Sequence, residues 1–589
     1  MESLEHYLNL LFEHDKRDNL KTVLKTEDSF KLPIYFNEKK QKLPDNIFDD
    51  LELLDSNESI DSSMCLYDCV FDNKNKLGKE TMKLWSEYYT TDKKFLKDSQ
   101  DFYNNIEVKK TNDPDKMYNL AQYYLKTYNN ESFRGEYDYI EIKYFDFLNY
   151  SSYVLQFLSM YNLFSPIQAL MVPIFILIIP FFILKLRGMN ITTEGYSNIL
   201  IDLINKALIG KMFKLHTMDF REGIYTVISF LFYVYQIYAN IKYCYRFYTN
   251  INEINCKLAE IREFNNNTIE NMKMVLVSSK SLKSYEEFNK TVTINLNKLI
   301  SLNDELEYVD GLNLSYTNFY NIGYLMKYYF NLFQNKDYIG LMIYSLGFNG
   351  FILNVRDIKY NIESKKINKA TFTKKSISFK GAYYAPLKNK KNVKNDYNIK
   401  KNVIITGPNA SGKTTLLKST LFNIILSQQI GYGFYDEARI NPFDYFHCYL
   451  NIPDTSGRDS LFQAEARRCK SILDFIESKK TDNHFCIFDE IYSGTNPDEA
   501  TASAYAYLNY LLKHKNFKFM ITTHYFKVCK HLDKKMMNMN MGVICENYKM
   551  TYTYLVKNGI SSVKGGLKVL KELEYPDSII KDAEEKIDQ

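Results

Sequence analysis

One eight-residue segment constrains this chain more than any other. Residues 407–414 read Gly-Pro-Asn-Ala-Ser-Gly-Lys-Thr, the pattern G-x-x-x-x-G-K-[ST] of a phosphate-binding loop. An apolar run, 403–405, precedes it and a helical pattern, 415–430, follows it. In such a loop, backbone N–H groups turn toward the phosphates, the lysine reaches the β and γ oxygens, and the threonine binds Mg²⁺. The sequence therefore predicts a nucleoside triphosphate site, with these candidate ligands: Gly407, Pro408, Asn409, Ala410, Ser411, Gly412, Lys413, Thr414 and Thr415.

Two later strand patterns end in residues that suit the same chemistry. Phe485-Cys-Ile-Phe leads to Asp489 and Glu490. We expect Asp489 to hold the metal ion and Glu490 to orient or deprotonate the attacking water. Another β-like run, 517–522, leads to His524, which would then lie near the γ-phosphate. A purely structural role for this histidine is the alternative.

Composition limits the remaining choices. A chain of 589 residues has room for several domains. Its 75 Lys and Arg against 70 Asp and Glu leave a net charge of +5, too balanced to identify a nucleic-acid-binding protein from global charge. Nine cysteines without a C-x-x-C pair argue against a zinc site and suit a reducing compartment. The acidic N-terminus lacks the apolar core of a secretory signal.

Two uncharged stretches raise the question of a membrane. Residues 147–184 and 223–241 carry no charged side chain. Segments of about 20 apolar residues can cross a hydrocarbon core as helices, so we expect membrane association through 165–187 and 223–241. Two buried core helices of a large soluble domain are the alternative.

The topology of such a hairpin stays open at this point. With an ATP-using domain in the cytosol, two full spans would place a basic connecting segment outside, against the positive-inside tendency. The basic residues concerned are Lys185, Arg187, Lys206, Lys211, Lys214 and Arg221. A re-entrant or interfacial hairpin, kinked at Pro173 and Pro180, is the other possibility.

Helical periodicity marks the region between this hairpin and the phosphate loop. Apolar residues recur at three- and four-residue spacing as Ile251, Ile254, Leu258 and Ile261, and again as Leu296, Leu299, Leu302 and Leu306. These stripes predict long amphipathic helices. Residues 362–401 then hold twelve lysines against two carboxylates. A solvated surface is favoured there over a phosphate-backbone contact.

The motifs together resemble the ATPase domain of the MutS family, the mismatch-repair branch of the ABC-type ATPases. The family's G-P-N-x-x-G-K-S/T matches 407–414, its D-E-x-x-x-G-T matches 489–495 and its T-H-Y/F matches 523–525. Its S-x-F-x-x-E segment matches 460–465, and the tail, 559–570 and 574–583, is similar to its closing loop and helix. The resemblance implies an α/β P-loop ATPase domain with a mixed sheet flanked by helices, using ATP and Mg²⁺.

The same resemblance implies how such a site is completed. In this family two subunits pair head to tail, and Ser460 of one subunit would reach the γ-phosphate held by the other. Lys413, Glu490 and His524 would act on the phosphate and the water, while Thr414 and Asp489 would hold the metal ion. A homodimer acting on double-stranded DNA, in mismatch repair, is the function that follows.

Departures from the family pattern keep a second function open. Phe36-Asn37-Glu38 is the only Phe-x-Glu triplet near the start, and only about 150 residues precede the apolar hairpin, so mismatch reading is doubtful. Residues 457–460 read Gly-Arg-Asp-Ser where Gly-x-Ser is common. The alternative is a membrane-anchored, ATP-gated adaptor or membrane-organising protein without DNA binding, its ATPase domain facing the cytosol.

The expected organisation has four parts. Residues 1–150 have no assigned role, 151–247 form the apolar hairpin, 248–370 a helical lever region, and 371–589 the ATPase domain with a helical tail. The residue that stacks on adenine is left open, with Tyr383 and Tyr384 as candidates.

Overall fold

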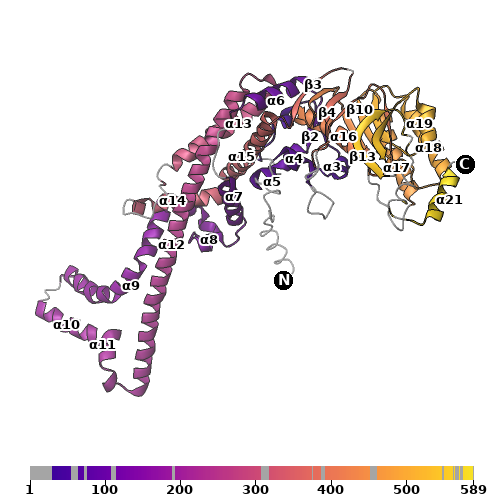
Figure 1. Cartoon of the computed structure of the whole chain (residues 1–589). Coiled ribbons are helices and arrows are strands. Elements are labelled where there is room, and N and C mark those ends of the chain that lie inside the picture. Colours follow the sequence, from indigo (N-terminus) through magenta and orange to yellow (C-terminus); the bar gives the residue numbers. More distant parts are fainter. Residues whose placement is uncertain are drawn as a thin grey trace. The chain divides into compact units, whose positions relative to one another are not determined.

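The computed structural model of the chain divides into two compact units, which are described separately (Figure 1). Unit 1 is built from Met1–Leu20, Asn119–Asn267 and Lys298–Ile343, and unit 2 from Lys21–Tyr118, Thr268–Asn297 and Tyr344–Gln589. The residues that the structure describes are 29–54, 64–71, 76–107, 114–188, 193–306, 309, 318–374, 376–386, 392–450, 460–546, 549–561, 563, 570, 573 and 575–587. Because both units combine segments far apart in the chain, the four expected domain boundaries stay predictions.

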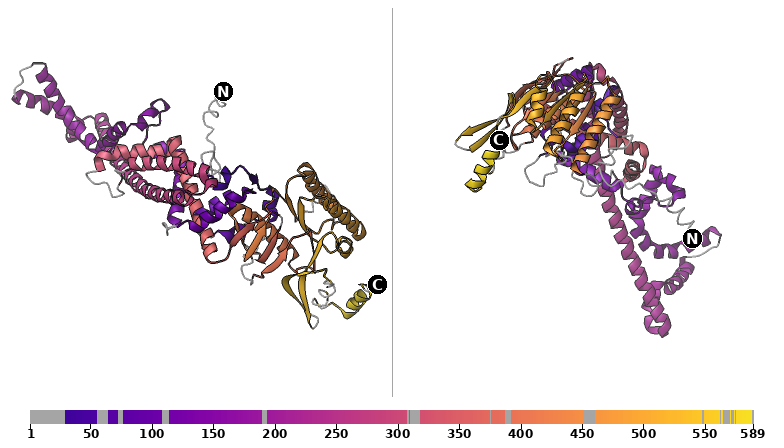
Figure 2. Two further views of the ribbon diagram at one scale, coloured as in Figure 1. Left: turned by 90° about the horizontal axis from the view of Figure 1, so that it is seen from above. Right: turned by 90° about the vertical axis from the view of Figure 1, so that its right-hand side faces the viewer.

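Unit 2 contains a six-stranded mixed sheet in the order β13-β12-β6-β11-β10-β9. Its strands are among the orange and yellow arrows of Figure 2. The strands are β6 Val403–Thr406, β9 Tyr445–Tyr449, β10 His484–Asp489, β11 Phe517–Thr522, β12 Met537–Glu546 and β13 Lys549–Asn558. All pair in parallel except β13, which runs antiparallel to β12 at one edge. Parallel strands present their carboxyl ends at one edge, so the loops after β6, β10 and β11 meet there.

Helices cover both faces of this sheet. On one face, α17 (Leu461–Ser478), α18 (Pro497–Leu511) and α19 (Phe526–Leu532) share a buried core with Phe488 and Phe519. Strand residues alternate between faces, so Phe485 points the other way, and its ring lies 5.1 Å from Phe443. Gln428 of α16 (Lys413–Ile430) bonds to the backbone of Phe443, which places α16 on that second face. The expected mixed α/β architecture is confirmed.

A second sheet and an N-terminal segment pack beside α16. The five-stranded sheet has the order β5-β4-β8-β3-β7. Its strands are β3 Asn368–Phe372, β4 Ser378–Ala382, β5 Asn395–Asn398, β7 Tyr432–Gly433 and β8 Glu437–Ile440. The N-terminal elements are η1 Pro33–Phe36, β1 Lys40–Lys42, α3 Asp45–Asp50, α4 Leu66–Val70, α5 Lys76–Trp85, β2 Tyr88–Thr90 and α6 Lys93–Asn105.

Buried amides of α16 hold this N-terminal segment. Nε2 of Gln429 donates to the carbonyl of Trp85 at 2.8 Å, and its Oε1 accepts from the hydroxyl of Tyr67 at 2.7 Å. Nε2 of Gln428 donates to the carbonyl of Thr90 at 3.2 Å. Buried polar groups need such partners, because an unpaired amide costs about 1–3 kcal/mol. The described residues between 29 and 107 are thus part of the body that carries the phosphate loop.

Unit 1 is helical. Its elements, some shared with unit 2, are α7 Pro114–Tyr128, α8 Phe133–Glu136, η2 Lys143–Tyr150, α9 Ser152–Leu186, α10 Thr193–Lys206, α11 Leu208–Phe213, η3 Leu215–Thr217, α12 Phe220–Ser279, α13 Glu286–Glu305, η5 Asn318–Asn321, α14 Ile322–Gln334 and α15 Lys336–Glu363. The remaining elements of unit 2 are η4 Lys283–Tyr285 and α21 Asp577–Ile587. Both expected leucine and isoleucine stripes, on α12 and α13, are buried, so the prediction of amphipathic helices is confirmed.

The uncharged stretch 147–184 lies in η2 and α9, and 223–241 lies in α12. Leu155, Ser159 and Thr226 are buried, but the described apolar side chains beyond them are mostly exposed. Among the described residues, two helices are long and apolar enough to cross a membrane, Phe220–Ser279 and Lys336–Glu363. In the first, 6% of the apolar window is buried, and in the second 83%. Lys336–Glu363 is therefore a core helix by its burial, whereas the alternative of buried core helices does not describe residues 223–241.

Candidate nucleotide-binding site

The phosphate loop joins β6 to α16 through a tightly turned backbone. Gly407 and Gly412 have φ angles of 154° and 94°, and Ala410 has 60°, in the left-handed region that side chains avoid. A Cβ on Gly407 would lie 2.9 Å from Oγ of Ser411, so the loop closes around these small residues. Oγ of Ser411 is buried without a hydrogen-bond partner in the described part of the chain. A buried hydroxyl without a partner in this loop fits a phosphate oxygen.

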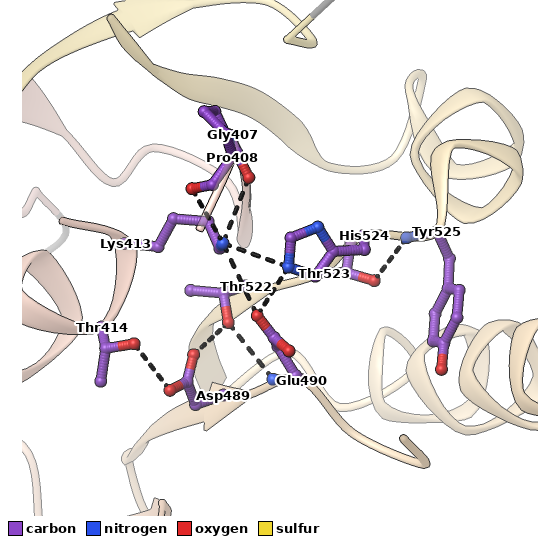
Figure 3. Close-up of polar contacts among 10 residues, drawn as sticks. All are labelled: Gly407, Pro408, Lys413, Thr414, Asp489, Glu490, Thr522, Thr523, His524 and Tyr525. Carbon is purple, nitrogen blue, oxygen red and sulfur yellow. Dashed lines mark hydrogen bonds and ion pairs between the residues drawn. The ribbon is translucent and has the colours of Figure 1, made fainter. Parts of the chain in front are cut away.

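Lys413 begins α16 and lies at the centre of a polar cluster (Figure 3). Its Nζ donates to the carbonyls of Gly407 at 3.1 Å and Pro408 at 3.4 Å. The same atom lies 3.2 Å from Nε2 of His524 and 3.6 Å from Oε1 of Glu490. The side chain is only 6% exposed, so its charge acts at low dielectric on anything that enters the loop.

Asp489 ends β10 opposite the first turn of α16. Oγ1 of Thr414 donates to its Oδ2 at 2.8 Å, and Oγ1 of Thr522 donates to its Oδ1 (Figure 3). Asp489 pairs in register with Thr522 in the neighbouring strand. A threonine hydroxyl beside a carboxylate offers the hard oxygen ligands that Mg²⁺ prefers. The two predicted metal ligands are thus brought together.

Glu490 and His524 follow adjacent strands and touch. Nε2 of His524 lies 2.9 Å from Oε1 of Glu490. The hydrogen bond from His524 holds the pKa of the Glu490 carboxyl below its ordinary value, with a further contribution from the charge of Lys413. Glu490 is therefore ionised at neutral pH and acts as an acceptor. The φ of Glu490 is 52°, so the backbone leaves β10 in a strained turn at the residue that carries this carboxylate.

Ser460 and the signature segment occupy another part of unit 2. Ser460 is the N-cap of α17, where its Oγ accepts from the backbone N–H of Gln463 in a capping box. The residue is exposed, and the contacts described for it are with its own helix. Residues 457–459 lie outside the described part of the chain. The structure does not bring Ser460 into the Lys413 cluster of its own subunit.

Several site residues were missed by the sequence reasoning. The buried carboxylate of Glu465 accepts from Ser493, through N at 3.1 Å and Oγ at 2.8 Å, and from the N–H of Gly494 at 3.2 Å. Thr522 accepts the N–H of Glu490 at both its carbonyl and its hydroxyl, each at 3.2 Å. Each residue lay inside or beside a recognised motif, which was the available signal.

The aromatic ring that lies against the loop is also not one of the predicted ones. Cδ1 of Tyr554 lies 3.1 Å from the position of a Cβ on Gly412, and Tyr554 has a left-handed φ of 55°. Tyr383 instead packs 5.6 Å from Phe434, with its hydroxyl donating to the carbonyl of Lys366. No alternation or motif distinguishes Tyr554 from the many other tyrosines of the chain.

Two other sequence features have structural partners. Asn37 of the Phe-x-Glu triplet bonds to Asp92 at 3.2 Å and accepts from Thr90 at 2.9 Å, while Phe36 packs 6.1 Å from Phe288. This triplet belongs to the packed body of unit 2. In the lysine-rich segment, Lys369, Lys380 and Lys394 form ion pairs with Asp101, Glu437 and Asp436, respectively.

The fold and these contacts define an α/β protein whose phosphate-loop lysine, paired strand-end carboxylates and strand-end histidine meet at one sheet edge. Residues 403–589 match the family model of MutS domain V. Over this domain the chain is similar to proteins of the MutS family.

Three relatives illustrate the range of the match. The chain is 26% identical over 234 residues, 40% of its length, to "DNA mismatch repair protein MutS" of Treponema denticola. It is 29% identical over 186 residues, 31% of its length, to "Endonuclease MutS2" of Lactococcus lactis, and 32% identical over 195 residues, 31% of its length, to "MutS protein homolog 4" of Mus musculus. These matches cover 25%, 24% and 19% of the respective relatives, so the chain spans a quarter or less of their length.

Proposed function

We propose that this chain is a MutS-type ATPase of the P-loop, ABC class, converting ATP and water to ADP and phosphate with Mg²⁺. The observation that carries this proposal is the meeting of Lys413, Thr414, Asp489, Glu490 and His524 at one sheet edge (Figure 3). A phosphate loop alone would support binding. A carboxylate held ionised beside the loop lysine supports hydrolysis as well.

Each residue has a role that its position allows. Backbone amides of 407–412, Oγ of Ser411 and Thr415 would hold the phosphates, while Thr414 and Asp489 would hold Mg²⁺, which neutralises charge on the β and γ oxygens. Lys413 would stabilise the same charge. Glu490 would take a proton from the attacking water as the water oxygen bonds to the γ phosphorus. The bond from that phosphorus to the bridging oxygen breaks, and the bridging oxygen leaves with ADP. His524 would contact the γ-phosphate.

The contact between Glu490 and His524 must change for this to happen. Nε2 of His524 cannot donate to Glu490 and accept from Lys413 at the same time. It contacts Glu490 when it carries a proton and Lys413 when it does not. A phosphate placed between Lys413 and His524 would attract the ammonium group of Lys413 and accept a hydrogen bond from Nε2 of His524, which would leave Oε1 of Glu490 for water. Tyr554, whose ring lies against Gly412, is in position to contact the rest of the nucleotide.

Two substitutions separate binding from hydrolysis. Lys413→Ala should abolish binding of a fluorescent ATP analogue, since it removes the only ammonium group in this cluster among the described residues. Glu490→Gln should keep binding and lower kcat by about 10² or more, because the amide does not act as a base. Lys527→Ala and Glu286→Gln, both at exposed positions, are the matched controls. Parental turnover by Glu490→Gln would refute the assigned role.

We further propose a head-to-tail homodimer in which Ser460 completes the site of the partner subunit. The observation that supports this is that Ser460 is exposed at the start of α17. A phosphate loop supplies donors to one side of a triphosphate only, so the developing negative charge needs donors from elsewhere. A helix N-terminus supplies N–H donors and a favourable dipole for a γ-phosphate presented by a second copy.

Double-stranded DNA is the partner that the MutS relationship favours, in a mismatch-repair-related role. Because DNA binding releases counterions, affinity for a duplex should fall steeply between low and physiological salt. The second candidate is an ATP-gated protein that acts on a membrane without gripping DNA, and the exposed apolar parts of α9 and α12 favour it. Nucleotide-dependent liposome binding without duplex affinity would select this second candidate.

A further inference from the structure

We propose that the distal part of unit 1, comprising residues 165–187 of α9, the connecting helices α10 and α11, and residues 220–241 of α12, is embedded in a lipid bilayer. This segment is called the apolar hairpin below. The proposal concerns the solvent that surrounds these helices and does not depend on the nucleotide chemistry of unit 2.

The first observation is a change of character within one helix. In the second half of α12, Ile254 and Leu258 are fully buried, and the apolar residues form one stripe. In its first half, Leu231 and Phe232 are 61% and 67% exposed. The same continuous helix therefore passes from a stretch that protein buries to one that is mostly exposed and touches α9 on one side.

The second observation is how the exposed residues are distributed around the helix. Val227 and Ile228, Leu231 and Phe232, and Val234 and Tyr235 are all exposed. At about 100° per residue these positions form one apolar face about 160° wide. A coiled-coil partner would cover only the narrow seam of positions at heptad spacing within this face. An exposed apolar face of this width matches lipid.

The third observation is length and charge. Residues 223–241 are uncharged, and as a helix they span about 28 Å, close to the roughly 30 Å of a hydrocarbon core. Residues 147–184 of the antiparallel partner are also uncharged. The helices touch where Tyr233 donates to the carbonyl of Ala169 and Cys244 to that of Leu163, each at 3.3 Å.

Both ends of the hairpin carry interfacial residues. At the end nearer the rest of unit 1, Arg246 pairs with Asp138 at 3.0 Å, and Tyr238 and Tyr245 are exposed. Tyrosines favour the boundary between lipid and water. At the other end, six basic residues of 185–222 outnumber four acidic ones, for a net charge of +2. The basic residues are Lys185, Arg187, Lys206, Lys211, Lys214 and Arg221, and the acidic ones Glu194, Asp202, Asp219 and Glu222. Anionic headgroups are the complementary surface.

The connecting helices α10 and α11 join the far ends of the two arms, so both arms enter the bilayer from the same side. Figure 1 shows α9 bending along its length and separating from α12 toward α10 and α11. The ring of Tyr196 in α10 lies 4.5 Å from that of Phe181, so α10 folds back onto the end of α9. Both arms thus start from and return to the same body, and the bilayer is entered and left through one leaflet.

Depth-dependent fluorescence quenching tests the proposal directly. The chain has one tryptophan, Trp85, which is buried in unit 2 and gives a constant background. Phe232→Trp adds a second, inside the apolar hairpin. With vesicles of phosphatidylcholine and phosphatidylserine, brominated acyl chains should quench the added emission. Val277→Trp, at a 77% exposed position further along α12, should not be quenched and is the matched control.

Flotation supplies the second measurement. The parent chain should float with these vesicles, and the double variant Leu231→Asp, Phe232→Asp should stay in the dense fraction, while Val277→Asp floats. ATP turnover is measured on the same preparations. Because the double variant leaves unit 2 unchanged, turnover tests the proposed ATPase function independently of the proposed bilayer embedding. The proposal would be overturned if the emission of Phe232→Trp were not quenched, or if the double variant floated. It would also be overturned if the parent chain stayed free of vesicles and paired with a second copy through this face.

Discussion

At the scale of single residues, Glu465 links the start of α17 to the turn after Glu490. Its buried carboxylate receives three hydrogen bonds from Ser493 and Gly494, and the turn contains two left-handed residues, Glu490 and Tyr492. A strained turn persists only when its surroundings hold it. The position of the Glu490 carboxylate therefore depends on Glu465.

Glu465→Gln should lower kcat about tenfold while nucleotide affinity changes little. The amide presents a donor where the two N–H groups and one hydroxyl need acceptors, a mismatch worth about 1–3 kcal/mol. Single-turnover hydrolysis and equilibrium binding, measured side by side, test this. Glu477→Gln, at the far end of the same helix, is the control. An equal loss of affinity and turnover would point to general unfolding of the loop instead.

A buried histidine pair predicts acid sensitivity of unit 2. Nε2 of His447 lies 3.1 Å from Nδ1 of His484, whose Nε2 donates to the carbonyl of Lys479. Burial lowers the pKa of His447 from 6.5 to about 3. The unfolded chain thus binds protons more readily, so stability falls as pH drops from about 6.5 toward 3, by on the order of 1–2 kcal/mol at pH 5.

Urea midpoints measured between pH 7 and pH 4 check this expectation. His447→Gln, which cannot titrate, should reduce the slope of stability against pH in that range, although its stability at pH 7 is also lower. An unchanged slope in this variant would assign the acid sensitivity to other groups.

At the scale of elements, local sequence patterns predicted the strand-end motifs and the amphipathic helices, but not the contacts between distant segments. The strand-end motifs around Asp489 and His524 were readable because each follows a short apolar strand, and parallel pairing then brings the strand ends together. The amphipathic stripes of α12 and α13 were readable because helical spacing repeats. The contact between Tyr67 and Gln429 was not, because 362 residues separate the partners and neither belongs to a motif.

The hydrogen bonds of Gln429, at the end of α16, are expected to contribute to the free energy of unfolding. Gln429→Leu should destabilise unit 2 by about 2–4 kcal/mol, because it leaves the carbonyl of Trp85 and the hydroxyl of Tyr67 buried without partners. Tyr67→Phe removes only one of these groups. A double-mutant cycle in urea should therefore show coupling between the two positions, and simple additivity would contradict the structural role given to this contact.

At the scale of the whole molecule, the most informative features are surfaces that have no partner within the described part of one chain: the apolar segments of unit 1 and the start of α17. The apolar segments 165–187 and 223–241 were recognisable from the absence of charge, but only three-dimensional packing distinguishes an exposed helix from a core helix such as α15. In the same way, the S-x-F-x-x-E motif was recognisable, but only the family resemblance, and no local pattern, implied that Ser460 acts on the site of a partner subunit. Both cases concern what a surface faces, which local sequence does not encode.

Mixing two inactive variants tests the dimer that Ser460 implies. Lys413→Ala and Ser460→Ala should each be inactive alone. In a head-to-tail pair, a mixed dimer regains one complete site, which joins Lys413 of one subunit to Ser460 of the other. Random reassociation of equal amounts should restore about a quarter of parental ATP turnover, since half of the dimers are mixed and each has one working site. Ser471→Ala, an exposed serine on α17, should leave turnover unchanged. No recovery on mixing, with both variants still dimeric, would mean that Ser460 acts within its own subunit or not at all.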